Sequence, residues 1–129
     1  MYKEILHQLE TEDKETEALW KLTHPEKSSH KHIFLTHGTF SDKRICLGIA
    51  SYFVENGYTC WILEWRNHGA SGKTKKRFNF ETIGLYDIKA AYGFLFKTEK
   101  IAHLNCITHS GGGICLTMFL IKNLEKFLQ

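Results

Sequence analysis

Hydrophobic and polar residues alternate near the N-terminus of the chain. Residues 2–8 switch sides at every step, and Ala18-Leu19-Trp20-Lys21-Leu22 forms a second short run that favours a strand. The polar stretch Glu10–Glu15 lies between the two runs. Alternation with a period of two is typical of strands that are covered on one face, so the pattern predicts an N-terminal β-hairpin.

Three later segments are apolar along their whole length instead of alternating. They are His32–Thr36, Tyr58–Trp65 and Ala102–Thr108. Short continuous apolar runs that contain strand-forming residues are typical of strands buried on both faces of a sheet. Each segment is therefore predicted to be a buried strand.

Helices are predicted after each of these strands. Asp42 is placed to cap a helix from Lys43 to Glu55, which Asn56-Gly57 closes. Glu81 to Lys97 and Ser110 to Lys126 give two more helices. In the middle helix the residues spaced for one buried face are Ile83, Ile88, Ala91 and Leu95.

The predicted order is a hairpin followed by β-α-β-α-β-α, and residues 1–129 are expected to belong to one domain, as its N-terminal part. This alternation implies an α/β fold with a parallel sheet and helices on both of its faces. Ligands of open α/β sheets bind at the carboxyl ends of the strands, so chemistry is expected there.

Composition adds a few limits. The net charge of +3 comes largely from the segment Lys73–Arg77, which favours a solvated loop rather than a nucleic-acid surface. No signal peptide or membrane span is apparent, and we expect a cytoplasmic protein. Cysteines at positions 46, 60, 106 and 115 contain no close pair and lie in apolar segments, which favours buried free thiols. His24, His30 and His32 match no zinc spacing, so neither a metal nor a cofactor is expected.

The segment Thr108-His109-Ser110-Gly111-Gly112-Gly113 joins a predicted buried strand to a helix. A serine on such a turn is held above the sheet, and small residues two positions away avoid a clash across the turn. Ser110 is therefore a candidate nucleophile, with the Gly111 amide facing a developing oxyanion. A helix that Ser110 merely caps, or a turn that binds phosphate, remains an alternative.

Two other strand ends carry related residues. His37-Gly38-Thr39 ends the first buried strand, and the Thr39 amide is a candidate second oxyanion donor. The second buried strand ends in the loop Arg66–Gly72, which contains His68. A plain strand-to-helix turn is the alternative for His37–Thr39, and a structural role is favoured over a general-base role for His68.

Together these motifs resemble the α/β-hydrolase superfamily, and within it the branch of monoacylglycerol lipases and lysophospholipases. The resemblance covers roughly residues 30 to 124 and rests on the order and spacing of the three motifs. It implies an ester or lipid substrate, Ser110 as nucleophile, and oxyanion amides from Thr39 and Gly111. It also implies supporting roles for His37, Gly38, Arg66, His68, Gly69, His109 and Gly112. Asp87 matches an acidic residue of the family that is not the catalytic acid.

Three departures from the family pattern matter. Glu64 and Asn67 replace an aspartate and a glycine, and Thr108 replaces the glycine before the nucleophile. In this superfamily the catalytic acid and histidine follow the serine along the chain. After Ser110 the only acidic residue is Glu125, and no histidine follows.

Three hypotheses follow. The chain is the N-terminal half of a serine hydrolase, truncated after the nucleophile helix and inactive alone. Alternatively, it is a non-catalytic binding or assembly module, as a homo-oligomer or with a complementing C-terminal chain. The third hypothesis is an unrelated α/β domain that holds a phosphate at Gly111–Gly113.

Overall fold

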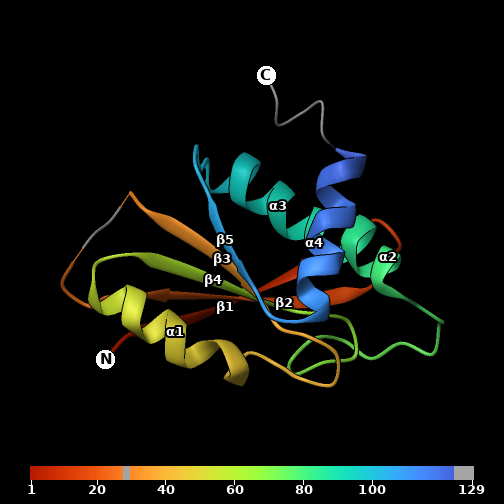
Figure 1. Cartoon of the computed structure of the whole chain (residues 1–129), viewed down its shortest axis with the longest axis horizontal. Helices are drawn as coiled ribbons and strands as arrows, with labels where there is room; N and C mark the ends of the chain where they lie inside the picture. Colours follow the sequence, from red (N-terminus) through yellow and green to blue (C-terminus); the bar gives the residue numbers. More distant parts are fainter. Residues whose placement is uncertain (28–29, 124–129) are drawn as a thin grey trace.

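The computed structural model describes residues 1–27 and 30–123, which form one mixed sheet with helices on both faces (Figure 1). The strands are β1 (Lys3–Glu10), β2 (Thr16–Thr23), β3 (His32–Thr36), β4 (Thr59–Glu64) and β5 (Asn105–Thr108). Their order across the sheet is β1-β2-β4-β3-β5. β1, β2 and β4 pair antiparallel, whereas β3 pairs parallel with both β4 and β5. The predicted hairpin and the predicted parallel strands are therefore confirmed.

Two hydrophobic cores explain the continuous apolar runs of β3 and β4. On one face Ile33, Leu35 and Ile62 pack with the buried side of α1 (Arg44–Glu55), as expected for a helix that covers a sheet. On the other face Phe34 and Trp61 pack with the helices that follow β4 and β5. Because successive side chains of a strand point to opposite faces, a strand covered twice has no polar side.

The connection from β4 to β5 is a loop followed by one long helical segment with two kinds of turn. It contains α2 (Phe80–Thr82), a π-helical turn (Ile83–Ile88), α3 (Lys89–Gly93) and a second π-helical turn (Phe94–Thr98). The predicted helix is confirmed in place, and its predicted apolar stripe is fully buried. The π turn brings Ile83 and Ile88, five positions apart, onto the same buried side. Asn79 and Thr82 form a reciprocal capping box at the helix start.

Several predicted boundaries change in the structure. α1 begins at Arg44 with Lys43 as its N-cap, so the prediction that Asp42 is the cap was wrong by one position. The Asp42 carboxylate instead accepts from the backbone N–H of Arg44 at 2.9 Å and from its guanidinium. The strand predicted over Tyr58–Trp65 is confirmed as the shorter β4.

The prediction of a buried strand over Ala102–Thr108 was wrong in length and in burial. β5 contains only Asn105–Thr108, and its side chains are exposed or half-buried because β3 is its single neighbour in the sheet. Cys106 is consequently exposed, unlike the buried Cys46, Cys60 and Cys115, although all four thiols are free as predicted. Its sulfur lies 2.8 Å from the hydroxyl of Tyr92.

The last described helix is α4, which covers Gly111–Lys122 and packs beside α2 and the first π turn (Figure 1). The helix predicted to run from Ser110 begins one residue later, and its predicted end at Lys126 lies outside the described residues. Among the described residues no helix is long and apolar enough to span a bilayer.

Candidate active site

The three motifs from the sequence meet at one edge of the sheet, where the parallel strands β4, β3 and β5 end. Thr36 at the end of β3 lies beside Leu63 of β4 and beside Thr108 of β5 in the sheet register. The backbone N–H of His109 donates to the carbonyl of Thr36 at 3.1 Å. Ser110 and His37 are therefore brought close together by backbone pairing alone.

Ser110 has a backbone conformation that few residues other than glycine adopt. Its φ is 51° and its ψ is −122°, and it is the junction between β5 and α4. Such a conformation costs a non-glycine residue on the order of 1–3 kcal/mol and persists only where the surroundings enforce it. The enforcing bonds here are Gly112 N–H to the His109 carbonyl and Gly113 N–H to the Ser110 carbonyl, both 3.0 Å. Ser110 is exposed, and its side chain does not cap the helix.

Two glycines allow the loop after β3 to approach this turn. A Cβ atom on Gly38 would lie 3.1 Å from the His109 carbonyl and 3.2 Å from Cβ of Ser110. A Cβ atom on Gly112 would lie 2.6 Å from the His37 carbonyl oxygen, which is closer than atoms pack. Side chains at either position would therefore push the two loops apart.

The third glycine of the run explains how a threonine can be accommodated at position 108. Gly113 faces Thr108 so closely that an added Cβ would lie 3.1 Å from the threonine Oγ1. The expected conflict between a branched side chain at position 108 and a tight turn is thus relieved from the helix side. Sequence reasoning identified the glycine run but did not assign this use to its last member.

The two predicted oxyanion donors are backbone amides without a protein acceptor. In the described part of the chain, neither the Thr39 N–H nor the Gly111 N–H donates to another backbone or side-chain group. Gly111 is the first residue of α4, where a helix leaves its N–H groups unpaired. Thr39 is exposed on the neighbouring loop. Free amides at this place are a requirement for binding an oxyanion.

His37 is buried and shapes the loop that carries Thr39. Its Nδ1–H donates to the Gly38 carbonyl at 2.6 Å, and its Nε2 accepts from the Trp65 backbone N–H at 3.0 Å. Both ring nitrogens are thus engaged in the neutral tautomer. Burial lowers the pKa of His37, which keeps the ring neutral. These bonds fit the expected supporting role.

His68 connects the loop after β4 to the loop after β3. Its Nδ1–H donates to the Arg66 carbonyl at 2.8 Å, and its Nε2 accepts from the Phe40 N–H at 3.3 Å. Because both nitrogens serve the backbone, this geometry fits the expected structural role rather than that of a general base. Gly69, with a φ of 52°, lies directly against the Glu64 carboxylate, which leaves no room for a side chain.

Glu64, which replaces the aspartate of the family pattern, accepts hydrogen bonds from three parts of the chain. Its carboxylate accepts from the Trp20 indole at 2.7 Å, the Lys43 N–H at 2.9 Å and the Ala70 N–H at 3.0 Å. The longer side chain therefore joins β2, the start of α1 and the loop after β4.

Arg66 extends this support into a buried ionic network. Only 1% of its side chain is exposed, and its guanidinium bonds Asp87 of the π turn and Asp13 of the hairpin at 2.7 Å each. Burial opposes ionisation, but these bonds raise the pKa of Arg66 above its ordinary value. The bond with Arg66 also lowers the pKa of Asp13. Sequence reasoning placed Arg66 and Asp87 in supporting roles but did not identify Asp13, whose position in a polar turn gave no signal.

Glu17 lies within the electrostatic reach of this network without a hydrogen bond of its own. Both carboxyl oxygens are buried and unpartnered among the described residues. Burial, followed by the charge of Asp87, raises the pKa of Glu17 well above that of a free carboxyl. Both effects favour the neutral form of Glu17.

Phe80 is a second residue at the site that the sequence did not reveal. Its ring lies against Gly111, where an added Cβ would be 2.8 Å from the ring carbon Cζ. It also packs edge-on to Trp65, with ring centroids 6.1 Å apart. An aromatic residue at the start of α2 therefore forms a wall beside the serine turn.

No side chain of the described residues hydrogen bonds to the Ser110 hydroxyl. His109, next to it, is exposed. The geometry thus assembles the turn and the amides but brings no base to the serine. Within the described part of the chain no cluster of His, Cys, Asp or Glu is suited to a metal ion.

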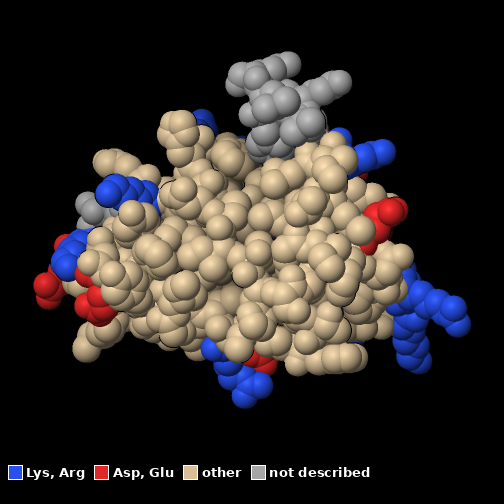
Figure 2. All heavy atoms as spheres, in the orientation of Figure 1, with Lys and Arg blue, Asp and Glu red and all other residues tan. Residues whose placement is uncertain are grey.

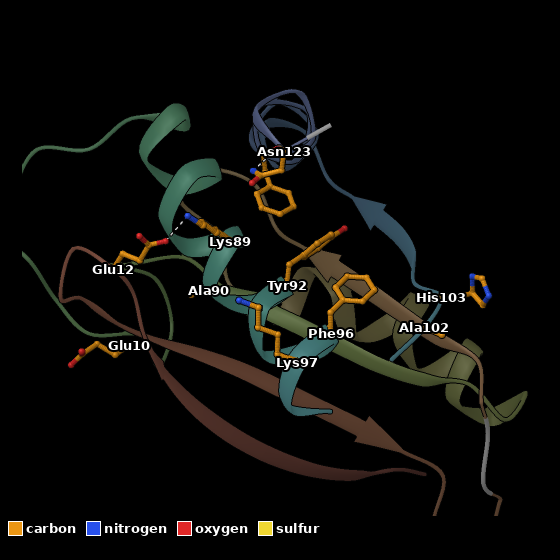
Figure 3. A pocket seen from close by; sticks show the side chains of 12 residues that line it. Glu10, Glu12, Lys89, Ala90, Tyr92, Phe96, Lys97, Ala102, His103 and Asn123 are labelled. Atoms are coloured by element: carbon orange, nitrogen blue, oxygen red, sulfur yellow. Dashed lines mark hydrogen bonds and ion pairs between the residues drawn. The ribbon is translucent and has the colours of Figure 1, made fainter. Parts of the chain in front are cut away.

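A cavity of about 710 Å³ lies elsewhere, between the end of β1, α3 and the later part of α4. Its lining includes Glu12 and Lys89, whose charged atoms are 2.6 Å apart, and the aromatic ring of Tyr92 (Figure 3). None of its lining residues belongs to the three strand ends, so this cavity is separate from the serine turn.

Comparisons with solved structures agree on the fold. An esterase from Pyrococcus furiosus, Pf2001, superposes with a TM-score of 0.71 at 24% identity, over 96% of this chain and 46% of that chain. An esterase from Exiguobacterium antarcticum gives a TM-score of 0.76 at 14% identity, over 91% and 40%. A haloalkane dehalogenase variant from Bradyrhizobium elkanii gives 0.71 at 18% identity, over 93% and 36%.

The chain thus spans less than half of the length of these structures. A comparison with curated proteins finds no match. The α/β hydrolase fold family matches residues 31–128, a range that contains all three motifs of the site. The chain belongs to the α/β hydrolase fold family.

Proposed function

We propose that Ser110 is the nucleophile of a serine hydrolase that cleaves carboxylic esters, with acylglycerols or lysophospholipids as the substrate class. The observation that carries the proposal is the conformation of Ser110, with its φ of 51° between β5 and α4. The free amide of Gly111 follows it directly, and that of Thr39 lies on the loop whose Gly38 packs against Ser110; a strained serine beside unpaired N–H donors is the arrangement that acyl transfer requires.

In the proposed reaction the Ser110 oxygen attacks the ester carbonyl carbon, and the Thr39 and Gly111 amides hold the resulting oxyanion. The bond to the alcohol then breaks, and the alcohol departs with a proton. Water subsequently cleaves the acyl-serine. The proton transfers need a base, and no residue of this chain occupies a family-matched position for one. Base and acid are therefore proposed to come from polypeptide beyond these 129 residues.

The test is acylation of the purified chain by p-nitrophenyl acetate, followed by intact mass. We expect slow, stoichiometric acetylation of Ser110, because the oxyanion amides operate without a base. The rate should rise about tenfold per pH unit between pH 6 and 9, since only deprotonated serine reacts. Ser110→Ala should abolish the modification, and Ser51→Ala, in α1, is the matched control. Equal acetylation of S110A would contradict the proposal.

One observation favours a second function, that of an assembly module. β5 ends the sheet with exposed side chains and carries no charged residue. Such edges pair readily with another strand. Sedimentation should then show a defined oligomer or a stable complex with a second polypeptide, and a monomer under all conditions would exclude this function.

A further inference from the structure

The loop between β4 and α2 carries a cluster of four cations next to the candidate active site. Lys73, Lys75, Lys76 and Arg77 are all exposed. Figure 2 shows Lys and Arg side chains projecting at the lower right, where this loop runs in Figure 1. Among the described residues only Lys76 of the four forms an ion pair, with Glu15 at 3.4 Å. The cluster therefore keeps most of its positive charge.

Hydrogen bonds hold this loop in place. Lys73 Nζ donates to the Asn67 carbonyl at 3.1 Å, and Lys76 Nζ donates to the Asp13 carbonyl at 3.0 Å. Asn67 also receives the Thr74 N–H on its side-chain oxygen at 2.6 Å. These bonds fix the backbone of the loop on both sides of Lys75, and the carbonyl partner of Lys73 orients that lysine without neutralising its charge.

An exposed aromatic side chain lies at the same edge of the sheet. Phe40 follows the oxyanion residue Thr39 and is 97% exposed. Its φ of 58° is unfavourable for a bulky residue, and its N–H is bound by His68 from the cationic loop's own segment. The protein thus maintains, at a cost in backbone energy, a ring that contacts water instead of the core.

The serine turn contacts both the cationic loop and the loop that carries Phe40. Phe80, which ends the cationic loop, lies against Gly111, and Gly38, two residues before Phe40, lies against Ser110. In Figure 1 both loops and the start of α4 lie along the lower side of the molecule. The loop that carries the cations therefore contacts the serine turn through Phe80 and the Phe40 loop through His68, so the cations, Phe40 and Ser110 lie on neighbouring loops at one edge of the sheet.

We infer that this edge docks on an anionic phospholipid surface, with the cations on the headgroups and Phe40 in the interface. Clusters of four or more cations are attracted to anionic lipid, and an exposed aromatic ring adds affinity by leaving water. RNA is the less suitable occupant, because a single exposed ring offers no row of stacking positions. The inference deepens the proposed function, since the ester would be delivered from the lipid, but docking itself requires no catalysis.

The experiment is sedimentation of the whole chain with vesicles of phosphatidylcholine, with and without about 30% phosphatidylserine, at about 100 mM salt. We expect binding to the anionic vesicles alone, and a loss of binding at about 500 mM salt. K75E/R77E should weaken binding about tenfold or more, and Phe40→Ser should weaken it several-fold. The matched control is K97E/K122E, which changes the net charge equally at the opposite end of the strands and should retain most of the affinity.

Each outcome decides the inference. Equal binding to neutral vesicles, no binding to anionic ones, or an equal loss in the two charge-reversed variants overturns it. Tighter binding to a single-stranded RNA than to anionic vesicles, lost in K75E/R77E, also overturns it. Circular dichroism checks folding, and K75Q/R77Q is the milder substitute. Ser110→Ala should bind vesicles like the wild type. Vesicle binding without acetylation of Ser110 would contradict the proposed hydrolysis alone, and acetylation without vesicle binding would contradict the docking alone.

Discussion

The two edge strands of the sheet differ in how they meet water. β1 carries the charged residues Lys3, Glu4 and Glu10, and Glu4 pairs with Lys43 at 2.7 Å. β5 carries Asn105, Cys106, Ile107 and Thr108, none of them charged. Charges on an edge strand discourage pairing with other chains. β1 is therefore protected against pairing with another strand, whereas β5 is not protected and can pair with one.

The loops of the site that follow β3 and β4 are also held in place differently from the serine turn that follows β5. The loops after β3 and β4 are joined to the hairpin by partly buried hydrogen bonds, of Glu64 with Trp20 and the Lys43 N–H and of Arg66 with Asp13. The serine turn follows β5, which only β3 pairs with, and depends on close glycine contacts with its surroundings. Half of the site is thus fixed by ionic bonds, and the other half by packing.

The largest effect is expected from Arg66→Met. It leaves Asp87 buried without its charge partner, and breaking a buried pair in this way costs about 3–5 kcal/mol. Urea denaturation followed by tryptophan fluorescence measures the change. Arg44→Met removes the exposed pair with Asp42 and is the control, with a midpoint expected to match the wild type. Similar midpoints for the two variants would mean that the ionic network contributes little.

Gly84→Ala tests how firmly α4 holds the serine turn. A Cβ on Gly84 would lie 2.5 Å from the Cys115 carbonyl of α4, so we expect a loss of about 1–3 kcal/mol. Gly93 is in the same helical segment with open space around it, and Gly93→Ala should stabilise by about 0.5–1 kcal/mol. Thermal melts of both variants compare them, and a common sign would refute the assigned contact.

Glu17→Gln tests whether the buried carboxyl group of the hairpin makes stability depend on pH. The folded chain keeps Glu17 protonated because its pKa is raised, whereas the unfolded chain releases that proton above its ordinary value. Wild-type stability is therefore lost as pH rises above the ordinary carboxyl pKa, and the advantage of the variant should grow with pH in that direction. Urea midpoints at several pH values measure this trend. Glu10→Gln, at an exposed position, should show no such trend; a pH-independent difference for E17Q would contradict a neutral Glu17.

Gly113→Ala should cost about 1 kcal/mol, because the new methyl group meets Thr108 Oγ1. In a T108A background the same change should become neutral or stabilising, since the contact is gone and alanine favours helix. The double-mutant cycle, measured by urea denaturation, should give a coupling of at least about 0.5 kcal/mol. Additivity would show that Gly113 does not accommodate Thr108.

The smallest effect on stability, but a clear effect on association, is expected from Asn105→Lys. A charge on β5 should suppress edge pairing and reduce light scattering on concentration, with stability changed by less than about 0.5 kcal/mol. Gln8→Lys adds the same charge to β1, which is already charged, and should change little. Equal effects of both substitutions would remove the distinction between the two edges.

Much of the fold could be predicted because burial leaves a direct trace in sequence. β3 was predicted to the residue, since a strand between two cores has an apolar run with polar ends. The helix with Ile83 and Leu95 was predicted in place, but its π turns were not, because the five-residue step from Ile83 to Ile88 was interpreted as part of an α-helical stripe, although an α-helix does not keep such a step on one face. The length of β5 was missed because Leu104, in the apolar run before it, packs against the core outside the sheet.

The candidate site could be predicted where it is local in sequence and not where it is assembled over distance. Ser110, Gly111 and Gly112 form one short motif, so their place in one turn followed from the sequence. The partnership of Arg66 with Asp13 joins residues 53 positions apart, and no local pattern encodes it. The roles assigned to Ser110, Thr39 and Gly111 remain predictions until acylation is measured.

The position of Trp65 has an optical consequence. Its indole N–H donates to Thr36 Oγ1 at 2.7 Å, and its ring lies 4.7 Å from the imidazole of His37, centroid to centroid. Imidazolium quenches indole emission far more strongly than neutral imidazole does, and His37 is held neutral by burial. The intrinsic fluorescence of Trp65 should therefore fall when His37 becomes protonated, so it reports the charge state of this histidine without any added dye.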